Sequence, residues 1–310
     1  MSFDTIRIDT DARGVARLWL ARADKHNALS AGMLDDLTAA ARQLGADDAV
    51  RVVVLAAEGK SFCAGGDLAW MREQMDADAA TRRAGAAALA GMLNAMNELP
   101  KPLIARCHGN AFGGGVGMLS VCDVAIGAEG AKFGLTETRL GLIPATIGPY
   151  VVARMGEAKA RRVFMSARIF DAAEARDLDL LARVVEPVDL DAAVEAEVAP
   201  YLQVAPKAVA AAKSLARALG PRIDAQVIEM TIDRLVGVWE DDEAPHGIAA
   251  FFDKRPARWQ GWRGGAEPKT AGRCARRFAF QESQSGRARL VQRLVAAGAG
   301  RRMVVAAHVR

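Results

Sequence analysis

Three glycine-rich segments and one glutamate have the residue types needed for acid/base chemistry on an anionic intermediate. The segments are 61–67 (SFCAGGD), 110–117 (NAFGGGVG) and 133–149, and the third contains Glu137. Each places glycine where a strand should become a helix, so that bare backbone N–H groups point into a cleft at a helix N-terminus. Two such turns facing each other would hold one oxyanion, and a carboxyl beside them would move a proton. A loop glycine on its own more often only permits a tight turn.

Other kinds of catalytic or cofactor site have less support. The run from Gly113 lacks the glycine at Met118 that a G-x-G-x-x-G motif needs, and neither a G-x-x-x-x-G-K-[ST] loop nor a G-x-S-x-G motif occurs. The histidines show no metal-ligand pairing and the cysteines form no C-x-x-C pair, so we predict no metal site and reduced thiols. These residues are His26, His108, His246 and His308, and Cys63, Cys107, Cys122 and Cys274.

The elements that must position these segments alternate between strand and helix. Apolar periodicity predicts a hairpin, three short apolar strands and two helices in the first half of the chain. Their ranges are 6–9 with 15–21, then 52–57, 102–107 and 124–128, and 30–44 and 79–99. From Asp189 on, only helical stretches are predicted, at roughly 189–202, 206–219, 223–238 and 243–253. We therefore expect an α/β core over 1–198 and a helical region over 199–262, packed on its own core or on a neighbouring subunit.

The composition excludes several classes of protein. The chain has 310 residues, of which 51% are hydrophobic and 25% charged, a balance typical of globular proteins rather than of disordered, collagenous or disulfide-rich ones. No uninterrupted apolar stretch is long enough to span a membrane, and residues 1–10 lack the order of a secretory signal. We therefore expect a cytoplasmic protein.

The basic charge is confined to the C-terminal end. Residues 264–310 hold Lys269 and nine arginines against Glu267 and Glu282, a net charge of +8, whereas residues 1–263 carry −4. We predict a basic, disordered tail over 263–310, which a read-through or frame-shifted extension would explain. The alternative is an arm that binds nucleic acid or an acidic membrane surface.

Four motifs, in this order, resemble the enoyl-CoA hydratase/isomerase (crotonase) superfamily. They are Arg22-Ala23-Asp24-Lys25-His26-Asn27-Ala28-Leu29, Phe62-Cys63-Ala64-Gly65-Gly66-Asp67, Gly113 to Gly117, and Phe133-Gly134-Leu135-Thr136-Glu137 with Leu140-Gly141-Leu142-Ile143-Pro144. The resemblance implies a spiral of strand-strand-helix repeats followed by C-terminal helices. It also implies an enzyme that acts on acyl-CoA thioesters with no metal or redox cofactor, coenzyme A being part of the substrate. The segment 136–150 most resembles bacterial methylglutaconyl-CoA hydratase-like proteins of leucine and related branched-acid breakdown.

By motif match, the resemblance assigns two oxyanion donors and one acid/base group. The backbone N–H groups of Ala64 and Gly114 would hold the thioester oxygen, and Glu137 would face the α and β carbons of the substrate. Apolar neighbours in the same segment would remove solvent from this carboxyl and raise its pKa. Without the motif, Glu137 would be interpreted as an exposed glutamate at a helix start, near Arg139.

The resemblance places further residues against the substrate. They are Lys25, His26, Ala28, Ala64, Gly65, Gly66, Asp67, Leu68, Gly113, Gly114, Phe251 and Lys254. Lys25 would meet a CoA phosphate or be a solvated surface lysine. Phe251 and Lys254 would reach the adenine end of CoA, often that of a neighbouring subunit. For Asp67 the stronger interpretation is the N-cap of a helix that begins at Leu68.

One position departs from the family pattern. Hydratases of the family typically carry a second glutamate two residues after the triple glycine, where this chain has Gly117. We expect reversible hydration of a branched or carboxylated 2-enoyl-CoA, such as 3-methylglutaconyl-CoA, with double-bond isomerisation by Glu137 alone as the alternative. On the hydratase hypothesis, Gly117→Glu should raise hydration of simple enoyl-CoA substrates if the helix tolerates it. A thioester binder without turnover is a third hypothesis, and the resemblance further implies a homotrimer or hexamer.

Overall fold

Two β-sheets form the centre of the protein. The computed structural model describes residues 3–261 of the chain. The larger sheet has the strand order β1-β2-β3-β5-β7-β10 and the smaller one the order β4-β6-β8-β9. The strands are β1 (Ile6–Thr10), β2 (Val15–Leu20), β3 (Val52–Ala57), β4 (Ser61–Cys63), β5 (Leu103–Cys107), β6 (Asn110–Phe112), β7 (Val124–Ala128), β8 (Lys132–Gly134), β9 (Ile169–Asp171) and β10 (Arg183–Val185). The predicted hairpin is confirmed, because β1 and β2 pair antiparallel.

Successive strands alternate between the two sheets. β3, β5 and β7 belong to the larger sheet, and each is followed by a short strand of the smaller sheet, β4, β6 or β8, before the chain becomes helical. This is the predicted strand-strand-helix repeat, so the fold class is confirmed. Because β4, β6 and β8 pair in parallel, the turns that follow them lie at one edge of the smaller sheet. The three glycine-rich segments occupy these turns.

Both faces of the larger sheet are buried, which explains the continuous apolar runs of its strands. In β3, Val53 and Leu55 face a core shared with helices of the first half of the chain. Val52 and Val54 face the opposite way, against Leu190 and other residues of a later helix. Alternate side chains of a strand point to opposite faces, so a strand covered on both sides must be apolar throughout.

Helices surround the two sheets. They are α1 (Ala31–Ala46), α2 (Leu68–Asp76), α3 (Ala79–Asn97), α4 (Gly114–Val121), α5 (Gly148–Met155), α6 (Glu157–Phe164), α7 (Ala172–Asp177), α8 (Leu190–Val198), α9 (Pro206–Leu219), α10 (Ala225–Trp239) and α11 (Glu243–Phe252). The prediction for the first of them is confirmed: Ser30 caps α1 by accepting a hydrogen bond from the Met33 N–H. Its predicted apolar face is buried, from Met33 to Leu44.

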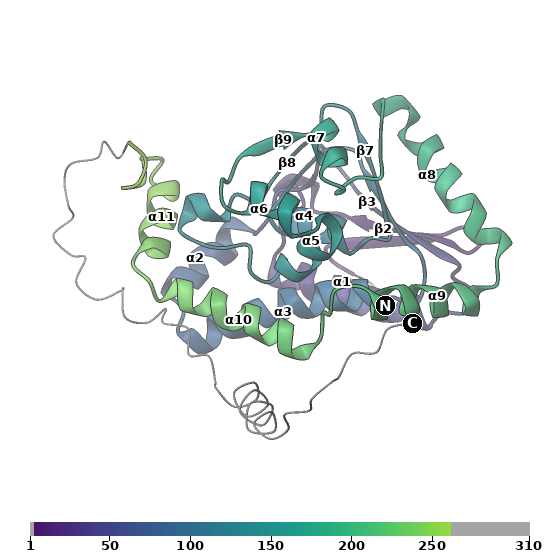
Figure 1. Cartoon of the computed structure of the whole chain (residues 1–310), viewed down its shortest axis with the longest axis horizontal. Helices are drawn as coiled ribbons and strands as arrows, with labels where there is room; N and C mark the ends of the chain where they lie inside the picture. Colours follow the sequence, from purple (N-terminus) through teal and green to yellow (C-terminus); the bar gives the residue numbers. More distant parts are fainter. Residues whose placement is uncertain (1–2, 262–310) are drawn as a thin grey trace, which may run out of the picture. The chain divides into compact units, whose positions relative to one another are not determined.

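The C-terminal helices pack on the core of their own chain. Figure 1 shows α10 and α11, drawn in green to yellow, beside α3 and α2. Ile232 of α10 is buried with Ala86 and Ala90 of α3. Ala244 and Ile248 of α11 are buried with Trp239 and pack against Leu140. The sequence left open whether this region packs on its own core or on a neighbouring subunit. The structure shows packing on its own core.

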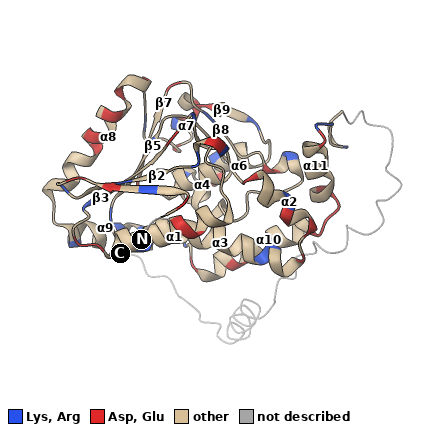
Figure 2. Cartoon of the chain, turned by 180° about the vertical axis from the view of Figure 1, so that it is seen from behind, with Lys and Arg blue, Asp and Glu red and all other residues tan. Residues whose placement is uncertain are grey.

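Charged residues are distributed over the described part of the chain. On the side seen in Figure 2, α8 carries only acidic residues, and the basic residues are scattered over other elements rather than gathered into a single face. No helix among residues 3–261 is both long and apolar enough to cross a membrane. The basic tail predicted for 263–310 lies outside the described residues.

Candidate active site

Glu137 is the first residue of a 3-10 turn, η2 (Glu137–Leu140), that follows β8. Its carboxyl lies over the start of α4, where a Cβ added to Gly113 would come within 3.1 Å of Oε1. The other oxygen, Oε2, is buried and has no hydrogen-bond partner among the described residues. Burial raises the pKa of Glu137 to about 7, because an ionised carboxylate loses the water that would solvate it. A carboxyl with this pKa can both accept and release a proton near neutral pH.

The turn before α4 exposes backbone donors beside this carboxyl. Gly113 has φ of 49°, in the left-handed region, and its N–H donates to the Gly134 carbonyl at 2.9 Å. This bond joins the α4 turn to the strand that precedes Glu137. Gly114 is the first residue of α4, so its N–H has no acceptor within the helix. Within residues 3–261 no other group accepts a hydrogen bond from it either, so the donor is available to a ligand.

The structure corrects the prediction that Ala64 supplies the second donor. The Ala64 N–H already donates to the His26 carbonyl at 3.0 Å. Two residues later, Gly66 lies opposite Leu29 in an isolated parallel β-bridge. The hydrogen bonds of this bridge are made by the residues on either side of Gly66: the Gly65 carbonyl accepts the Leu29 N–H, and the Asp67 N–H donates to the Leu29 carbonyl. The groups of Gly66 itself point the opposite way, and its N–H has no acceptor in the described part of the chain. Within residues 3–261, the Gly66 N–H is therefore available to a ligand, whereas the Ala64 N–H is engaged.

The segment predicted to contact CoA lies directly against this loop. Lys25 ends a 3-10 turn, η1 (Ala23–Lys25), and is exposed. His26 adopts φ of 51°, and its Nδ1 lies 3.3 Å from the Ser61 hydroxyl. Ala28 is buried, and its carbonyl accepts a hydrogen bond from Arg22 at 2.7 Å. The structure therefore brings Lys25, His26 and Ala28 next to the first glycine-rich turn.

Asp67 and Leu68 follow this loop at the start of α2. The N-cap interpretation of Asp67 is confirmed, because Oδ1 accepts the Ala69 N–H at 2.8 Å. The other carboxyl oxygen pairs with Arg22 at 2.9 Å. Both oxygens of Asp67 are thus engaged within the protein. Leu68 is 52% exposed, a large apolar side chain left in solvent beside the site.

Helix α11 covers the turn that holds Glu137. Gly141 has φ of 71°, and a Cβ there would come within 2.5 Å of the Glu243 backbone. On the helix, a Cβ on Gly247 would come within 2.5 Å of the Leu140 backbone. These two glycines allow the backbones of the turn and the helix to come into contact, so that α11 covers one side of the turn. Further along the same segment, Phe251 is half exposed and Lys254 adopts φ of 52°.

At Gly117, where hydratases of the family typically carry a second glutamate, an apolar side chain fills the space that a glutamate would need. Gly117 is buried in α4, and a Cβ there would come within 2.6 Å of Ile147 Cγ2 and 3.6 Å of Leu93 Cδ2. Ile147 immediately precedes α5, which packs on α4. Sequence reasoning missed Ile147 because its partner lies thirty positions away in the chain.

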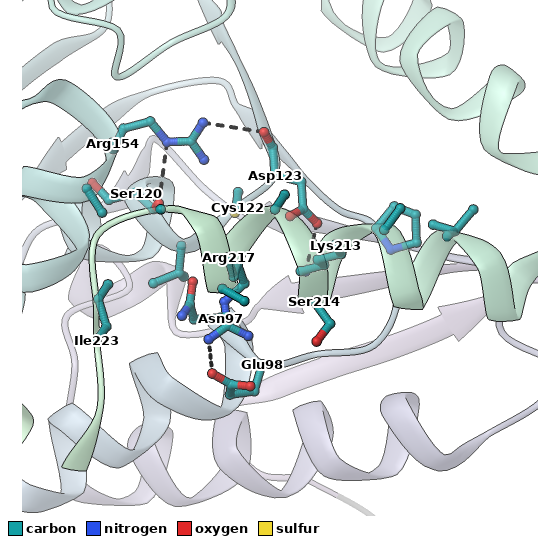
Figure 3. Close-up of a pocket in the computed structure, with 18 of the residues that line it drawn as sticks. Asn97, Glu98, Ser120, Cys122, Asp123, Arg154, Lys213, Ser214, Arg217 and Ile223 are labelled. Carbon is teal, nitrogen blue, oxygen red and sulfur yellow. Dashed lines mark hydrogen bonds and ion pairs between the residues drawn. The ribbon is translucent and has the colours of Figure 1, made fainter.

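A cavity of about 1320 Å³ lies at the other end of α4, under α9 (Figure 3). Two of the cations that line it are neutralised: Lys213 pairs with Asp123 at 2.8 Å, and Arg217 pairs with Glu98. None of the three glycine-rich segments lines it. Within residues 3–261, no three His, Cys, Asp or Glu side chains are placed to hold a metal ion. The groups suited to chemistry therefore gather at the N-terminus of α4.

Glu137 should make the stability of the folded protein depend on pH. Its folded-state pKa of about 7 exceeds the ordinary value of 4.5, so between these values the folded state binds more protons than the unfolded one. The free energy of unfolding should fall by about 2 kcal/mol between pH 5 and pH 8 through this group. The free energy of unfolding of Glu137→Gln, measured by urea titration, should not fall in this way between pH 5 and pH 8. The control Glu129→Gln, which changes an exposed glutamate, should show the same fall as the wild type. Equal pH dependence in wild type and Glu137→Gln would contradict the assignment of a raised pKa.

Comparison with known proteins shows which family the chain belongs to. A family model for enoyl-CoA hydratase/isomerase matches residues 10–262. The crystal structure of an enoyl-CoA hydratase from Shewanella pealeana is 35% identical, with a TM-score of 0.68 over 83% of this chain and 96% of that one. A mitochondrial methylglutaconyl-CoA hydratase from Mus musculus is 32% identical over 272 residues, 82% of each chain. The chain belongs to the enoyl-CoA hydratase/isomerase family of enzymes, the crotonase superfamily.

Proposed function

We propose that the protein is an enoyl-CoA hydratase that adds water reversibly to the double bond of a 2-enoyl-CoA thioester. The observation that supports this most directly is the buried Glu137 carboxyl beside Gly113, at the start of a helix whose Gly114 N–H has no acceptor within residues 3–261. A helix N-terminus favours negative charge, and fixed backbone donors need no reorganisation during the reaction. The arrangement suits a reaction that passes through a thioester enolate.

The proposed reaction divides the work between donors and base. The N–H groups of Gly66 and Gly114 hold the thioester oxygen. Ionised Glu137 takes a proton from water as the water oxygen bonds to the β carbon and the π electrons move to the thioester oxygen. Protonated Glu137 then delivers a proton to the α carbon, and the enolate collapses to the thioester. The carboxylate is regenerated, so no metal or redox cofactor takes part, and CoA enters as part of the substrate.

The proposed substrate has a branched or carboxylated acyl chain, such as 3-methylglutaconyl-CoA. The segment 136–150 supports this by its resemblance to bacterial methylglutaconyl-CoA hydratase-like proteins, as does the mouse relative's name. The proposal also includes a cytoplasmic homotrimer or hexamer acting in branched-acid breakdown, which rests on the family resemblance. Sedimentation of the purified chain with and without substrate would test the assembly.

A second candidate is an enoyl-CoA double-bond isomerase. It is favoured by glycine at position 117, which leaves Glu137 as the sole carboxylate of the family pair, and by Ile147, whose side chain fills the space where a side chain at 117 would lie. One glutamate suffices to move a proton between two carbons of the same substrate.

The two reactions differ in the fate of water oxygen. We expect a panel of 2-enoyl-CoA thioesters in ¹⁸O-labelled water to give products with one labelled oxygen on the β carbon, detected by mass. Migration of a 3-enoyl double bond without label in any product would favour the isomerase. Binding of acyl-CoA with neither reaction would favour a thioester binder.

The basic tail provides a test against the nucleic-acid hypothesis. A chain that ends at Gly264 loses a net charge of +8 but keeps residues 10–262, which match the family model. We expect its turnover and oligomeric state to equal those of the full chain, measured by steady-state kinetics and light scattering. Loss of activity on truncation, together with salt-sensitive RNA or DNA binding by the full chain, would support a nucleic-acid-binding arm instead.

A further inference from the structure

Leu29 contacts both turns that supply the proposed oxyanion donors. We propose that Leu29 is a positioning residue, whose side chain sets the separation between the N–H groups of Gly66 and Gly114. The inference rests on the proposed function, because it concerns where the thioester oxygen would bind. It is supported by two backbone hydrogen bonds of Leu29, by one contact of its side chain, by its burial, and by the hydrogen bonds that hold the residues before it.

The backbone of Leu29 holds the first turn. Its N–H donates to the Gly65 carbonyl at 2.8 Å, and its carbonyl accepts the Asp67 N–H at 3.0 Å. This parallel bridge uses the groups on either side of Gly66 and leaves the Gly66 N–H facing away from Leu29. The direction of that donor is therefore set by the pairing with Leu29.

The side chain of Leu29 reaches the second turn. A Cβ on Gly114 would collide with Leu29 Cδ1, so the leucine occupies the space that a side chain at 114 would fill. Leu29 is only 4% exposed and belongs to the main hydrophobic core. Gly65 and Gly113 also approach each other, since a Cβ on Gly113 would lie 3.8 Å from the Gly65 Cα. Leu29 thus separates two backbones that are already close.

The residues before Leu29 hold it rigidly. Asn27 is fully buried and donates through Nδ2 to the carbonyls of Glu58 at 2.8 Å and Ser61 at 2.9 Å. Its Oδ1 accepts the Arg22 N–H at 2.9 Å. The Arg22 guanidinium, in turn, bonds both the Ala28 carbonyl and the Asp67 carboxylate. These hydrogen bonds hold the backbone next to Leu29 in place. When the Leu29 side chain is truncated, we therefore expect the α4 turn, rather than Leu29, to move.

Movement of one donor relative to the other should affect the transition state more than substrate binding. Negative charge is concentrated on the thioester oxygen only as the enolate forms, so misplaced donors lower kcat more than they raise KM. A displacement of about 1 Å in an active site can lower the rate about a hundredfold.

The experiment compares four variants of the full chain on the 2-enoyl-CoA that the wild type hydrates fastest. Leu29→Ala should lower kcat about a hundredfold with KM changed less than about threefold. Leu29→Val, a smaller change, keeps the test available if Leu29→Ala does not fold. Leu29→Met keeps the volume of the side chain close to that of leucine and should keep most of the activity. Leu37→Ala, which truncates an equally buried leucine of α1, is the matched control for core damage and should lower the melting temperature while retaining kcat.

Each outcome decides the inference. A fall in kcat specific to Leu29→Ala and Leu29→Val, with rescue in Leu29→Met, would support it. Unchanged kcat in the folded Leu29 variants, or an equal fall in Leu37→Ala, would overturn it while leaving the proposed function intact. A wild-type chain that turns over no enoyl-CoA would contradict the proposed function itself, and this inference with it.

Discussion

Glu137→Gln is expected to lower turnover of enoyl-CoA thioesters at least about a hundredfold, the smaller end of the range for a positioned proton-transfer group. The amide has nearly the shape of the carboxyl, so it should fit the same space over Gly113. Because Oε2 of Glu137 has no hydrogen-bond partner among the described residues, the change removes no internal bond of that oxygen. The variant should therefore fold and bind thioester while losing proton transfer.

The pH profile gives this prediction a second measurement. Glu137 must be ionised to take a proton from water, and its pKa of about 7 lies well above the ordinary value because the carboxyl is buried. In the wild type, kcat/KM for hydration should rise with pH and level off above about 7. The residual activity of Glu137→Gln should not show this rise of kcat/KM with pH. Isothermal titration with a saturated acyl-CoA checks binding, and turnover near the wild-type rate in Glu137→Gln would remove the glutamate from the mechanism.

Gly117→Glu is expected to destabilise the protein and to give no gain in hydration. The substituted Cβ would lie 2.6 Å from Ile147 Cγ2, so the core must shift to admit it. Overpacking of this kind costs about 1 to 3 kcal/mol, and an unpaired buried carboxyl adds a further penalty. Together these effects should lower the melting temperature by roughly 5 °C or more. From the sequence alone the opposite result is expected, that a second carboxylate raises hydration, because the contact with Ile147 is invisible there.

Gly91→Glu is the matched control. It makes the same substitution inside α3, where a Cβ meets nothing within 4 Å. Replacing glycine in an exposed helix position should be neutral or slightly stabilising. Thermal unfolding of both variants, and of Gly117→Glu with Ile147→Ala, measures the contact directly. A Gly117→Glu variant as stable as Gly91→Glu, or one with faster hydration than wild type, would show that the helix accommodates the glutamate.

Local patterns in the sequence predicted several elements of the core correctly. The apolar run of β3 and the periodic face of α1 identify a strand buried on both sides and a helix with one buried face. Ser30 and Asp67 have the residue types of N-caps, and both cap helices in the structure. Such signals depend on neighbours within one or two turns of the chain, so they can be recognised without tertiary contacts. The short strands of the smaller sheet, only three residues each, are too brief to show a period.

The sequence by itself determined which segments are candidates for the chemistry, through its glycine-rich turns and the glutamate that follows β8. Only the tertiary structure decided which groups are free to act. The Ala64 N–H is used because His26 reaches it from a separate segment, and the Gly66 N–H is free because Leu29 bonds its neighbours. Likewise Ile147 fills the space beside Gly117 only when α5 packs on α4. Hydrogen-bond partners and contacts of this kind join residues far apart in the chain, and so they are set by packing rather than by local pattern.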